Sequence, residues 1–350
     1  MPAELTVGVA TPLPAELRGE VLRREPRIRF LVEDELLPPM RFPADFHGDP
    51  DYRRSPAQQS RFERLLAGAD ALYGIPDASP AALKRAVDAN PELRWVQTMA
   101  AGGGSQIAAA GLSSAQLERV AFTTSAGVHG RPLAEFALFG LLAAAKRLPR
   151  LQADQRRHVW PAHRRPMAQL GDWTVLVIGL GGVGSEVARM LAALGANVIG
   201  MSRRLRAGLE LSEWVPPERL LEVVGRVDAI VSTLPGTERT AGLIGAEVFE
   251  RIQAGLTFVN VGRGSVVDER ALLEALDDGW VGFAALDVFA TEPLPAGSPL
   301  WEHPNVLVSP HTAALDPGEE FRIAGLFADN ATRLLDGRRL RNLVDTLEFY

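Results

Sequence analysis

The chain contains no cysteine, and only two of its 350 residues are lysine. The lack of cysteine excludes disulfides, thiolate nucleophiles and cysteine-ligated metals. Nearly all of the basic charge is carried by arginine, and neither Lys84 nor Lys146 lies in a motif that suits Schiff-base chemistry or a phosphate-binding loop. We therefore expect neither a metal centre nor catalysis by lysine.

Long apolar runs and a strong net charge are also missing. The longest apolar run, Phe136–Ala145, is far shorter than the roughly 20 residues of a membrane-spanning helix. The first residues, MPAELTVGVATPLP, do not have the basic and then apolar pattern of an export signal. A net charge of −6 gives no reason to expect nucleic acid or an anionic membrane as a partner. We predict a cytoplasmic protein that holds any acidic substrate with local cations.

Length and composition favour a folded enzyme of two domains. A chain of 350 residues is too long for one ordinary compact core. Its hydrophobic fraction of 47% and charged fraction of 23% are average for globular proteins. Short apolar runs alternate with helical stretches, which is typical of parallel sheets with helices on their faces. We predict an α/β protein with two Rossmann- or flavodoxin-like parallel-sheet domains and an active-site cleft between them.

The first part of the chain is predicted to form one of these sheets. Its strands are expected at Leu5–Val9, Ile28–Val32, Ala71–Gly74, Trp95–Thr98 and Val120–Thr123. Helices are expected to begin near Pro14, Pro56 and Ser79. The segment Leu37–Gln59 is rich in Pro, Asp and Arg and is interpreted mostly as a loop. Two interpretations of this loop remain open, a surface insertion and an active-site lid.

The second part of the chain has a more regular pattern. A long buried helix is predicted over Pro132–Leu148, and a polar connecting stretch over Leu151–Asp172. Six strands are then expected, at Thr174–Ile178, Asn197–Met201, Ala229–Leu234, Thr257–Val261, Phe283–Val288 and Val306–Ser309. A doubly wound nucleotide-binding domain needs this number of strands. The tail is predicted to form a helix from Phe321 to about Asp336-Gly337.

A glycine motif follows the first of these six strands. The sequence GLGGVG occupies residues 179–184 and runs into a helical stretch. Gly179 permits the tight turn, Gly181 lets the backbone approach a pyrophosphate, and Gly184 lets helix and strand pack closely. The N-terminus of the helix offers unpaired N–H groups to the phosphates. With strand and helix on both sides, the motif predicts a dinucleotide site; the alternative is a glycine turn that serves packing only.

The end of the second strand bears on the choice of cofactor. An acidic residue there would bind the ribose hydroxyls of NAD and repel a 2′-phosphate. This chain instead has Ser202, Arg203 and Arg204, which suit a phosphate unless the arginines are solvated surface charges. We therefore favour NADP(H), with NAD(H) as the alternative. The residues expected to contact the cofactor are Gly179, Gly181, Gly182, Val183, Gly184, Ser202, Arg203, Arg204, Leu234, Pro235, Thr240, Val261 and Asp287.

Three catalytic candidates follow the last strands. Arg263 comes after Thr257–Val261, Glu292 after Phe283–Val288, and His311 after Val306–Ser309. Because ligands of an open α/β sheet bind beyond the carboxyl ends of its strands, we expect these side chains to converge. Structural roles remain the alternative for each, as an ion pair, a turn residue and a cap respectively.

These residue types suit the reduction of a 2-oxo acid. An arginine fork can hold the carboxylate and polarise the ketone. Histidine can donate a proton to the alcohol oxygen near neutral pH. A nearby carboxylate favours the charged imidazolium and fixes its orientation, so we expect Glu292 to support His311. Asp287 is placed to accept hydrogen bonds from the carboxamide of the nicotinamide, or else to cap a helix.

The chain resembles the D-isomer-specific 2-hydroxyacid dehydrogenase family. The resemblance extends from about Trp95 to Asp345, and its segments in order are TMAAGGG, AGVHGRPLAEFAL, VIGLGGVG, VNVGRG, LDVFATEPLP, LVSPHTAA and NATRLLDGRRLRNLVD. It implies that Arg263, Glu292 and His311 are the catalytic residues, and that the stretch at Ala101 and Gly102 offers backbone amides to the substrate carboxylate. Residues 1–90 match the family poorly in detail.

The resemblance also implies a domain organisation and an assembly. The substrate-binding domain is expected to be discontinuous, made of residues 1–123 and 315–350, with a dinucleotide-binding domain at residues 124–314. A homodimer is expected, joined through the nucleotide domains and the long helix after Pro132.

Three functions are compatible with the sequence. The leading hypothesis is an oxidoreductase that reduces glyoxylate, hydroxypyruvate or a bulkier 2-oxo acid to the D-hydroxy acid with NAD(P)H. The second is a dehydrogenase of another small anion; members that act on formate replace the glutamate, so Glu292 argues against formate. The third is a cofactor-sensing interaction protein, like the corepressors that resemble these enzymes.

Overall fold

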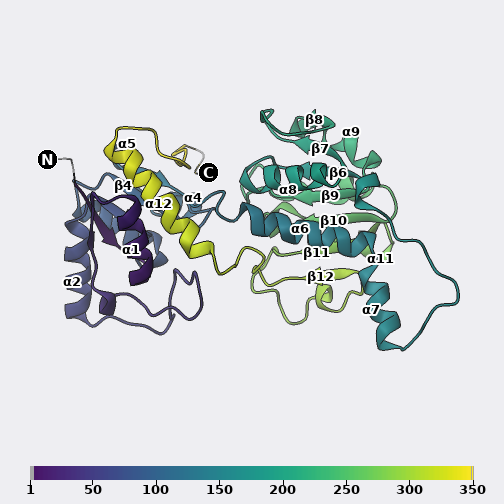
Figure 1. Ribbon diagram of the computed structural model, residues 1–350, viewed down its shortest axis with the longest axis horizontal. Coiled ribbons are helices and arrows are strands. Elements are labelled where there is room, and N and C mark those ends of the chain that lie inside the picture. The colour runs from purple at the N-terminus through teal and green to yellow at the C-terminus, as the bar shows by residue number, and fades with distance from the viewer. Residues whose placement is uncertain (1–3, 348, 350) are drawn as a thin grey trace. The chain divides into compact units, whose positions relative to one another are not determined.

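The computed structural model describes residues 4–347 and 349, and this part of the chain forms two compact units (Figure 1). The first unit combines the residues up to His129 with those from Leu315 onward, and the second contains Gly130–Ala314. The chain therefore passes from the first unit to the second after His129, a few residues later than the boundary expected after residue 123. Within the described residues no helix is both long and apolar enough to cross a membrane.

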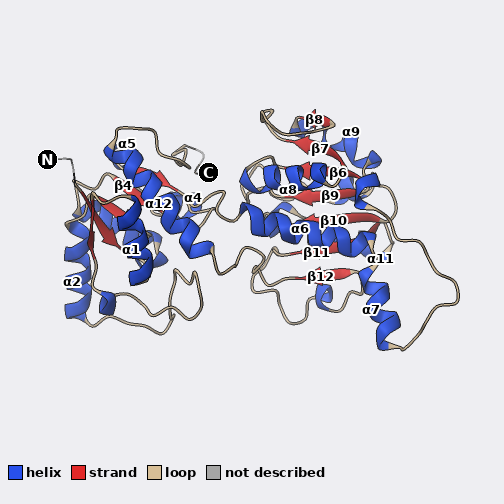
Figure 2. Ribbon diagram, in the orientation of Figure 1, coloured by secondary structure: helices blue, strands red, loops and turns tan. Residues whose placement is uncertain are grey.

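The first unit is built on a parallel five-stranded sheet with the order β2-β1-β3-β4-β5 (Figure 2). Its strands are β1 (Leu5–Val9), β2 (Ile28–Leu31), β3 (Ala71–Tyr73), β4 (Trp95–Gln97) and β5 (Ala121–Thr123). Its helices are α1 (Ala15–Arg24), α2 (Pro56–Ala67), α3 (Pro80–Ala89), α4 (Gly104–Ala109), α5 (Ser114–Arg119) and α12 (Glu319–Leu335). This strand order is that of flavodoxin-like folds.

Side-chain caps mark the first residues of α2 and α3. Ser55 and Gln58 form a reciprocal capping box at the start of α2, and Ser79 accepts the amide of Ala82 at the start of α3. Such caps satisfy amides that have no partner inside the helix. In both helices a proline follows the cap, where its missing N–H costs nothing.

Helix α12 belongs to the first unit although it lies near the end of the chain. It packs against α1, and its Phe327 ring stacks on Trp95 with 4.6 Å between ring centroids. Phe327 also meets Tyr73 edge-on at 5.1 Å. Contacts between aromatic rings are worth about 0.5–1.5 kcal/mol each beyond simple burial. The core of this unit therefore depends on residues from both ends of the sequence.

The second unit is built on a parallel seven-stranded sheet with the order β12-β11-β10-β9-β6-β7-β8. Its strands are β6 (Thr174–Ile178), β7 (Asn197–Met201), β8 (Glu213–Val215), β9 (Ala229–Ser232), β10 (Leu256–Asn260), β11 (Val281–Leu286) and β12 (Val306–Val308). Its helices are α6 (Gly130–Ala145), α7 (Leu148–Arg156), α8 (Gly182–Ala193), α9 (Leu220–Val223), α10 (Ala246–Phe249) and α11 (Glu269–Asp277). The predicted pair of parallel-sheet α/β domains is confirmed.

Two details of the second unit differ from the prediction. The stretch after Leu148 is not a plain connection, because α7 occupies its first part. Arg147 adopts a left-handed conformation (φ 56°) that ends one helix, and Pro149 in the first turn of α7 suits a new start. The short edge strand β8 was not expected either, since three residues are too few to show an alternating pattern.

Candidate active site

The glycine turn after β6 has the geometry of a phosphate cradle. Gly179 adopts φ 96°, a value that favours glycine. A Cβ atom on Gly184 would lie 1.8 Å from the carbonyl oxygen of Gly179, so the start of α8 packs directly against the turn. By contrast, a Cβ on Gly181 would meet no atom within 4 Å. The open space at Gly181, next to the N-terminus of α8 that begins with Gly182 and Val183, fits the pyrophosphate of a dinucleotide.

The loop after β7 contains the residues expected to choose the cofactor. Ser202 donates to the carbonyl oxygen of Arg204 at 2.7 Å and accepts from the Trp214 indole at 3.1 Å. Arg203 and Arg204 are exposed. The serine hydroxyl thus shapes the loop, and the arginine side chains lie at its surface.

Arg206 is a candidate that the sequence analysis missed. Its Nη1 donates to the carbonyl oxygen of Leu180 at 2.9 Å and to Ser185 Oγ at 3.3 Å. Both acceptors belong to the glycine turn or the first turn of α8. Arg206 therefore ties the loop after β7 to the phosphate cradle. A basic residue four positions after Ser202 was the available signal.

Further cofactor candidates lie in the turns after β9 and β10. Leu234 and Pro235 follow β9, and Thr240 Oγ1 donates to the carbonyl oxygen of Pro235 at 2.6 Å. Val261 directly follows β10 and is buried. A Cβ on Gly262 would lie 2.5 Å from the carbonyl oxygen of Leu234, so the turns after β9 and β10 are in direct backbone contact.

Arg263 follows at the carboxyl end of β10. Its side chain donates to the carbonyl oxygen of Gly262 at 2.7 Å, and the described residues include no carboxylate paired with it. The residue is exposed. A Cβ on Gly264 would lie 1.9 Å from the backbone carbon of Phe289, so this turn is pressed against the turn after β11. Arg263 is thus a charged, unpaired guanidinium beside the segment that leads to Glu292.

Glu292 and His311 form a hydrogen-bonded pair. Glu292 Oε2 lies 2.7 Å from His311 Nδ1, while Oε1 accepts the amide of Phe289 at 2.9 Å. The histidine has a left-handed backbone (φ 56°) and its side chain is 45% exposed. Because Nδ1 faces the carboxylate, Nε2 is the ring nitrogen left to act on a substrate. Strands β10, β11 and β12 are neighbours in the sheet, so the three catalytic candidates leave adjacent strand ends.

Asp287 follows β11, bonds the residues next to His311 and is almost fully buried. Its Oδ1 accepts from Ser309 Oγ at 2.6 Å and from the amides of Thr312 and Ala313 at 3.0 Å each. Burial raises the pKa of the Asp287 carboxyl above its ordinary value, and the hydrogen bonds oppose this effect. Its Oδ2 is buried and has no hydrogen-bond partner among the described residues. A buried acceptor without a partner fits the carboxamide of a nicotinamide.

The substrate candidates Ala101 and Gly102 lie in the first unit, in the turn after β4. Both are exposed, and no acceptor for their amides occurs in the described part of the chain. A Cβ on Gly103 would lie 1.9 Å from Thr98 Oγ1, so the turn folds tightly onto the strand end. Within the residues that the structure describes, no group of His, Asp and Glu could hold a metal ion.

Comparison with known proteins places this geometry in a family. The model for the NAD-binding domain of D-isomer specific 2-hydroxyacid dehydrogenases matches residues 138–313. A glyoxylate reductase from Korarchaeum cryptofilum is 33% identical over 265 residues, which are 74% of this chain and 78% of the relative. The chain belongs to the D-isomer specific 2-hydroxyacid dehydrogenase family.

Two other members show how the similarity is distributed. A crystal structure of the NADPH-dependent glyoxylate/hydroxypyruvate reductase from Sinorhizobium meliloti, in complex with NADP and sulfate, is 27% identical. It superposes with a TM-score of 0.76 over 99% of this chain and 100% of that chain. The D-3-phosphoglycerate dehydrogenase of Mycobacterium bovis is 33% identical over 78% of this chain, but the match spans only 52% of its length.

The comparisons confirm three predictions. The family is the one that the sequence resembles, the fold is that of its solved members, and the enzyme class is an oxidoreductase that uses a nicotinamide cofactor. The orphaned Asp287 oxygen and the open cradle at Gly181 agree with that class of cofactor.

Proposed function

We propose that this enzyme uses NADPH to reduce a small 2-oxo acid of the glyoxylate and hydroxypyruvate type to the D-2-hydroxy acid. One observation carries the proposal: an unpaired arginine and a glutamate–histidine pair leave the ends of three adjacent strands in a member of this dehydrogenase family. The names of the Korarchaeum and Sinorhizobium relatives support the substrate class.

Arg263 is proposed to bind the carboxylate of the substrate and to polarise its ketone. A guanidinium fork can donate two parallel hydrogen bonds to a carboxylate. Arg263 is suited to this because no carboxylate of the described protein neutralises it. The amides of Ala101 and Gly102 are further candidate donors to the carboxylate, as the family resemblance implies.

His311 is proposed to be the proton donor. Its Nε2 gives a proton to the ketone oxygen as the alcohol forms, and takes one back in the reverse direction. Glu292 holds the ring through its contact with Nδ1 and so fixes the orientation of Nε2. Asp287 supports the same turn through its bonds to the amides of Thr312 and Ala313, so it fixes the backbone directly after the histidine.

The cofactor is proposed to lie along the carboxyl ends of the second sheet. Gly181, Gly182 and Val183 would hold the pyrophosphate, the turn at Leu234, Pro235 and Thr240 with Val261 would contact the nucleoside on the nicotinamide side, and Asp287 would accept from the carboxamide. When bound, the reduced nicotinamide supplies the hydride.

NADP(H) is favoured over NAD(H). The loop after β7 has no carboxylate at its start and carries Arg203, Arg204 and Arg206. Three guanidinium groups suit a 2′-phosphate. The Sinorhizobium neighbour was solved with NADP.

A homodimer is proposed, with a second copy covering the apolar side chains around α6 and α7. Phe139, Leu151, Trp160 and Met167 are 45–86% exposed. Figure 1 shows α7 and the loop after it extending away from the second sheet. Four large apolar side chains exposed within one stretch of the chain, residues 139–167, favour an interaction surface there. Light scattering of the wild type and of a Trp160→Glu variant measures the assembly; a monomeric wild type contradicts it.

The experiment for the activity follows NADPH and NADH oxidation by absorbance with glyoxylate, hydroxypyruvate, pyruvate and phenylpyruvate. We expect the highest kcat/KM with NADPH and one of the two smaller substrates. For Arg263→Ala we expect KM for the oxo acid to rise while KM for NADPH stays within about twofold, because only the substrate loses its cation. An unchanged KM for the oxo acid would exclude Arg263 as the carboxylate ligand.

A further inference from the structure

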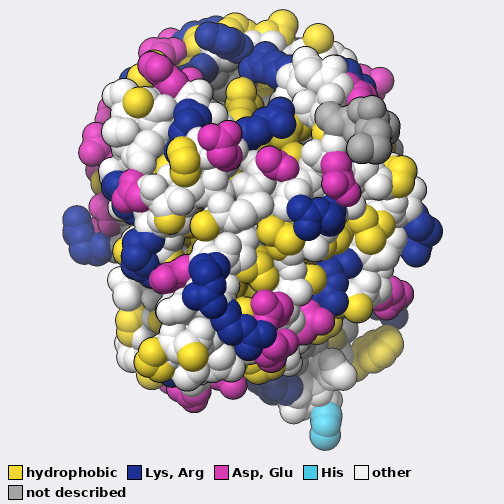
Figure 3. All heavy atoms as spheres, turned by 90° about the vertical axis from the view of Figure 1, so that its left-hand side faces the viewer, with side chains coloured by type: hydrophobic (Ala, Val, Ile, Leu, Met, Phe, Trp, Pro, Cys, Tyr) yellow, Lys and Arg dark blue, Asp and Glu magenta, His cyan; other side chains and the backbone are white. Residues whose placement is uncertain are grey.

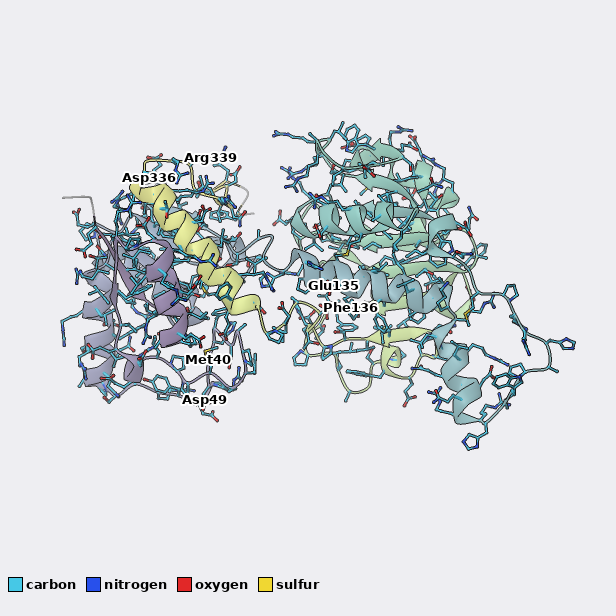
Figure 4. The ribbon with its side chains drawn as sticks, in the orientation of Figure 1. Met40, Asp49, Glu135, Phe136, Asp336 and Arg339 are labelled. Carbon is cyan, nitrogen blue, oxygen red and sulfur yellow. The ribbon has the colours of Figure 1, made fainter. Side chains whose placement is uncertain are left out.

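The loop between β2 and α2 is an ordered part of the first unit. Figure 4 labels Met40 and Asp49 on it. Inside the loop, the buried Asp45 accepts from the Arg41 guanidinium and from the amide of Gly48. The Arg41 guanidinium holds the pKa of the Asp45 carboxyl below its ordinary value. These contacts tie together residues 41–48 in the middle of the loop.

Arg54 links the two ends of the loop between β2 and α2. Its Nε donates to the carbonyl oxygen of Leu36 at 2.6 Å, on the other side of the loop. Its guanidinium lies 3.8 Å from the centre of the Phe62 ring, and only 6% of the side chain is exposed. Nη1 donates to Asp77 Oδ1 at 2.6 Å. Nη2 is buried and has no partner among the described residues. A buried guanidinium is costly unless it is paired. The ion pair with Asp77 offsets this cost for Arg54.

Asp77 lies in a strained turn. The chain leaves β3 through Gly74, and Asp77 (φ 54°) and Ala78 (φ 48°) then adopt left-handed conformations in succession. Residues other than glycine rarely adopt this conformation, and such strain persists only where the surroundings impose it. The ion pair with Arg54 is the charged side-chain contact made to this turn among the described residues. Strained backbone of this kind clusters at ligand sites.

The turn also lies where a ligand of the first sheet would bind. It follows the carboxyl end of β3, the middle strand of the sheet, and ligands of open α/β sheets bind at that edge. Gln106 Nε2 donates to the carbonyl oxygen of Ala78 at 3.1 Å. Gln106 is in α4, the helix that begins directly after Ala101 and Gly102. The strained turn and the candidate carboxylate-binding turn are therefore joined through one side chain.

We infer that Arg54 is a positioning residue that sets substrate selectivity: by holding Asp77 and Ala78 in their left-handed conformation, it fixes a turn that forms one wall for the side chain of the 2-oxo acid. This inference rests on the proposed function. It gives the loop between β2 and α2 a role that is neither a bare insertion nor a moving lid: the loop carries the arginine that fixes the selective turn.

Three variants test the inference, with the ratio of kcat/KM for phenylpyruvate to kcat/KM for glyoxylate as the readout. Arg54→Lys keeps the charge but cannot bond Leu36 and Asp77 at once. Asp77→Gly accepts the left-handed conformation without strain but removes the ion pair. For both we expect the ratio to change at least about fivefold through KM of the oxo acid. Asp77→Asn retains an oxygen acceptor and tolerates the same conformation, so its ratio should stay close to that of the wild type.

Arg53→Lys is the matched control. Arg53 precedes Arg54, is exposed, and bonds only to the backbone carbonyls of Pro50 and Tyr52 in the described structure. Its ratio should equal the wild-type ratio, and KM for NADPH should be unchanged in all variants. An unchanged ratio in folded Arg54→Lys and Asp77→Gly, with only a lower Tm, assigns Arg54 to stability alone and overturns the inference. If Arg54→Lys does not fold, Asp77→Gly decides. A wild type that turns over no 2-oxo acid with either cofactor instead overturns the proposed function.

Discussion

The turn after β3 in the first unit and the glycine turns of the second unit are built by different means. In the second unit the turns are formed by glycines pressed against neighbouring backbone, with Gly184, Gly262 and Gly264 leaving no space for a Cβ. In the first unit, the turn after β3 is left-handed at two residues that are not glycine, and Arg54 from a distant loop holds it. Glycine turns depend on local sequence, whereas a turn held by a remote side chain depends on the fold around it.

This difference has a functional consequence. A site made of backbone amides and close glycine contacts tolerates few substitutions, which suits a cofactor that is the same in every turnover. A site whose walls are positioned by side chains can change its shape when those side chains change. We therefore expect substitutions in the turns at the carboxyl ends of the second sheet to alter catalysis or cofactor use. Substitutions in the first unit should alter stability or substrate choice.

Replacing His311 is expected to have the largest effect. Because glutamine cannot donate a proton as an imidazolium does, His311→Gln should lower kcat by about 10²- to 10⁴-fold, with KM for NADPH nearly unchanged. Steady-state kinetics with glyoxylate measures this. His303→Gln is the control, because His303 precedes β12 and so lies at the opposite end of the strand. Equal losses in both variants would remove His311 from the chemistry.

The next largest effect is expected in the first unit, from the buried Glu25. Its carboxylate bonds the Arg27 guanidinium at 2.6 and 2.8 Å, which lowers its pKa from 4.5 to about 2. Since the folded pKa lies below the ordinary value, the pair stabilises the fold above about pH 4.5, and this contribution is lost as the pH falls towards 2. The shift corresponds to roughly 3 kcal/mol at neutral pH.

Glu25→Gln should therefore lower the stability of the first unit at pH 7 and weaken its dependence on pH below 4.5. Urea unfolding between pH 7 and pH 3 measures both. Glu16→Gln, an exposed position on the neighbouring helix α1, serves as the control and should retain the wild-type profile. A parallel drop at every pH would show that Glu25 acts through packing rather than charge.

Alanine variants of Gly181 and Gly184 distinguish a glycine needed for cofactor binding from a glycine needed for packing. Gly184→Ala should destabilise the second unit by about 1–3 kcal/mol or more, because its Cβ would collide with the carbonyl oxygen of Gly179. Gly181→Ala should leave Tm within a degree or two of the wild type, yet raise KM for NADPH about tenfold or more, because its methyl would fill the cradle. Thermal unfolding and cofactor titration distinguish them. A Gly181→Ala enzyme with normal cofactor affinity would place the pyrophosphate elsewhere.

The smallest effect concerns cofactor choice. Arg206→Ala should lower the ratio of kcat/KM with NADPH to kcat/KM with NADH by about tenfold, about 1.4 kcal/mol, because the loop after β7 loses its link to Leu180 and Ser185. Arg226→Ala removes an exposed arginine of the same unit that pairs with Glu213, and the ratio should not change. A preference for NADH in the wild type would contradict the assignment of this loop to a 2′-phosphate.

Much of the fold could be predicted from local patterns. The strands of both sheets other than β8 were found because apolar runs alternate with helical stretches, and the cap at Ser79 marked the start of α3. Apart from the nine-residue α7, the elements that escaped prediction, such as α4, α5 and β8, are short. An element of three to six residues is too brief for its periodicity to be visible, and its stability comes from neighbours in space.

The sequence by itself determined the family, the glycine turn after β6 and the three residues that follow the last strands, because each depends on a motif of a few adjacent residues. The tertiary structure alone decided the contacts between remote positions. Examples are the pairing of Arg54 with Asp77, the link from Arg206 to the glycine turn, and the packing of Phe327 on Trp95. The physical reason is that hydrogen bonds, charge pairs and ring contacts act over a few ångströms in space, and no local pattern records which distant residues the fold brings that close.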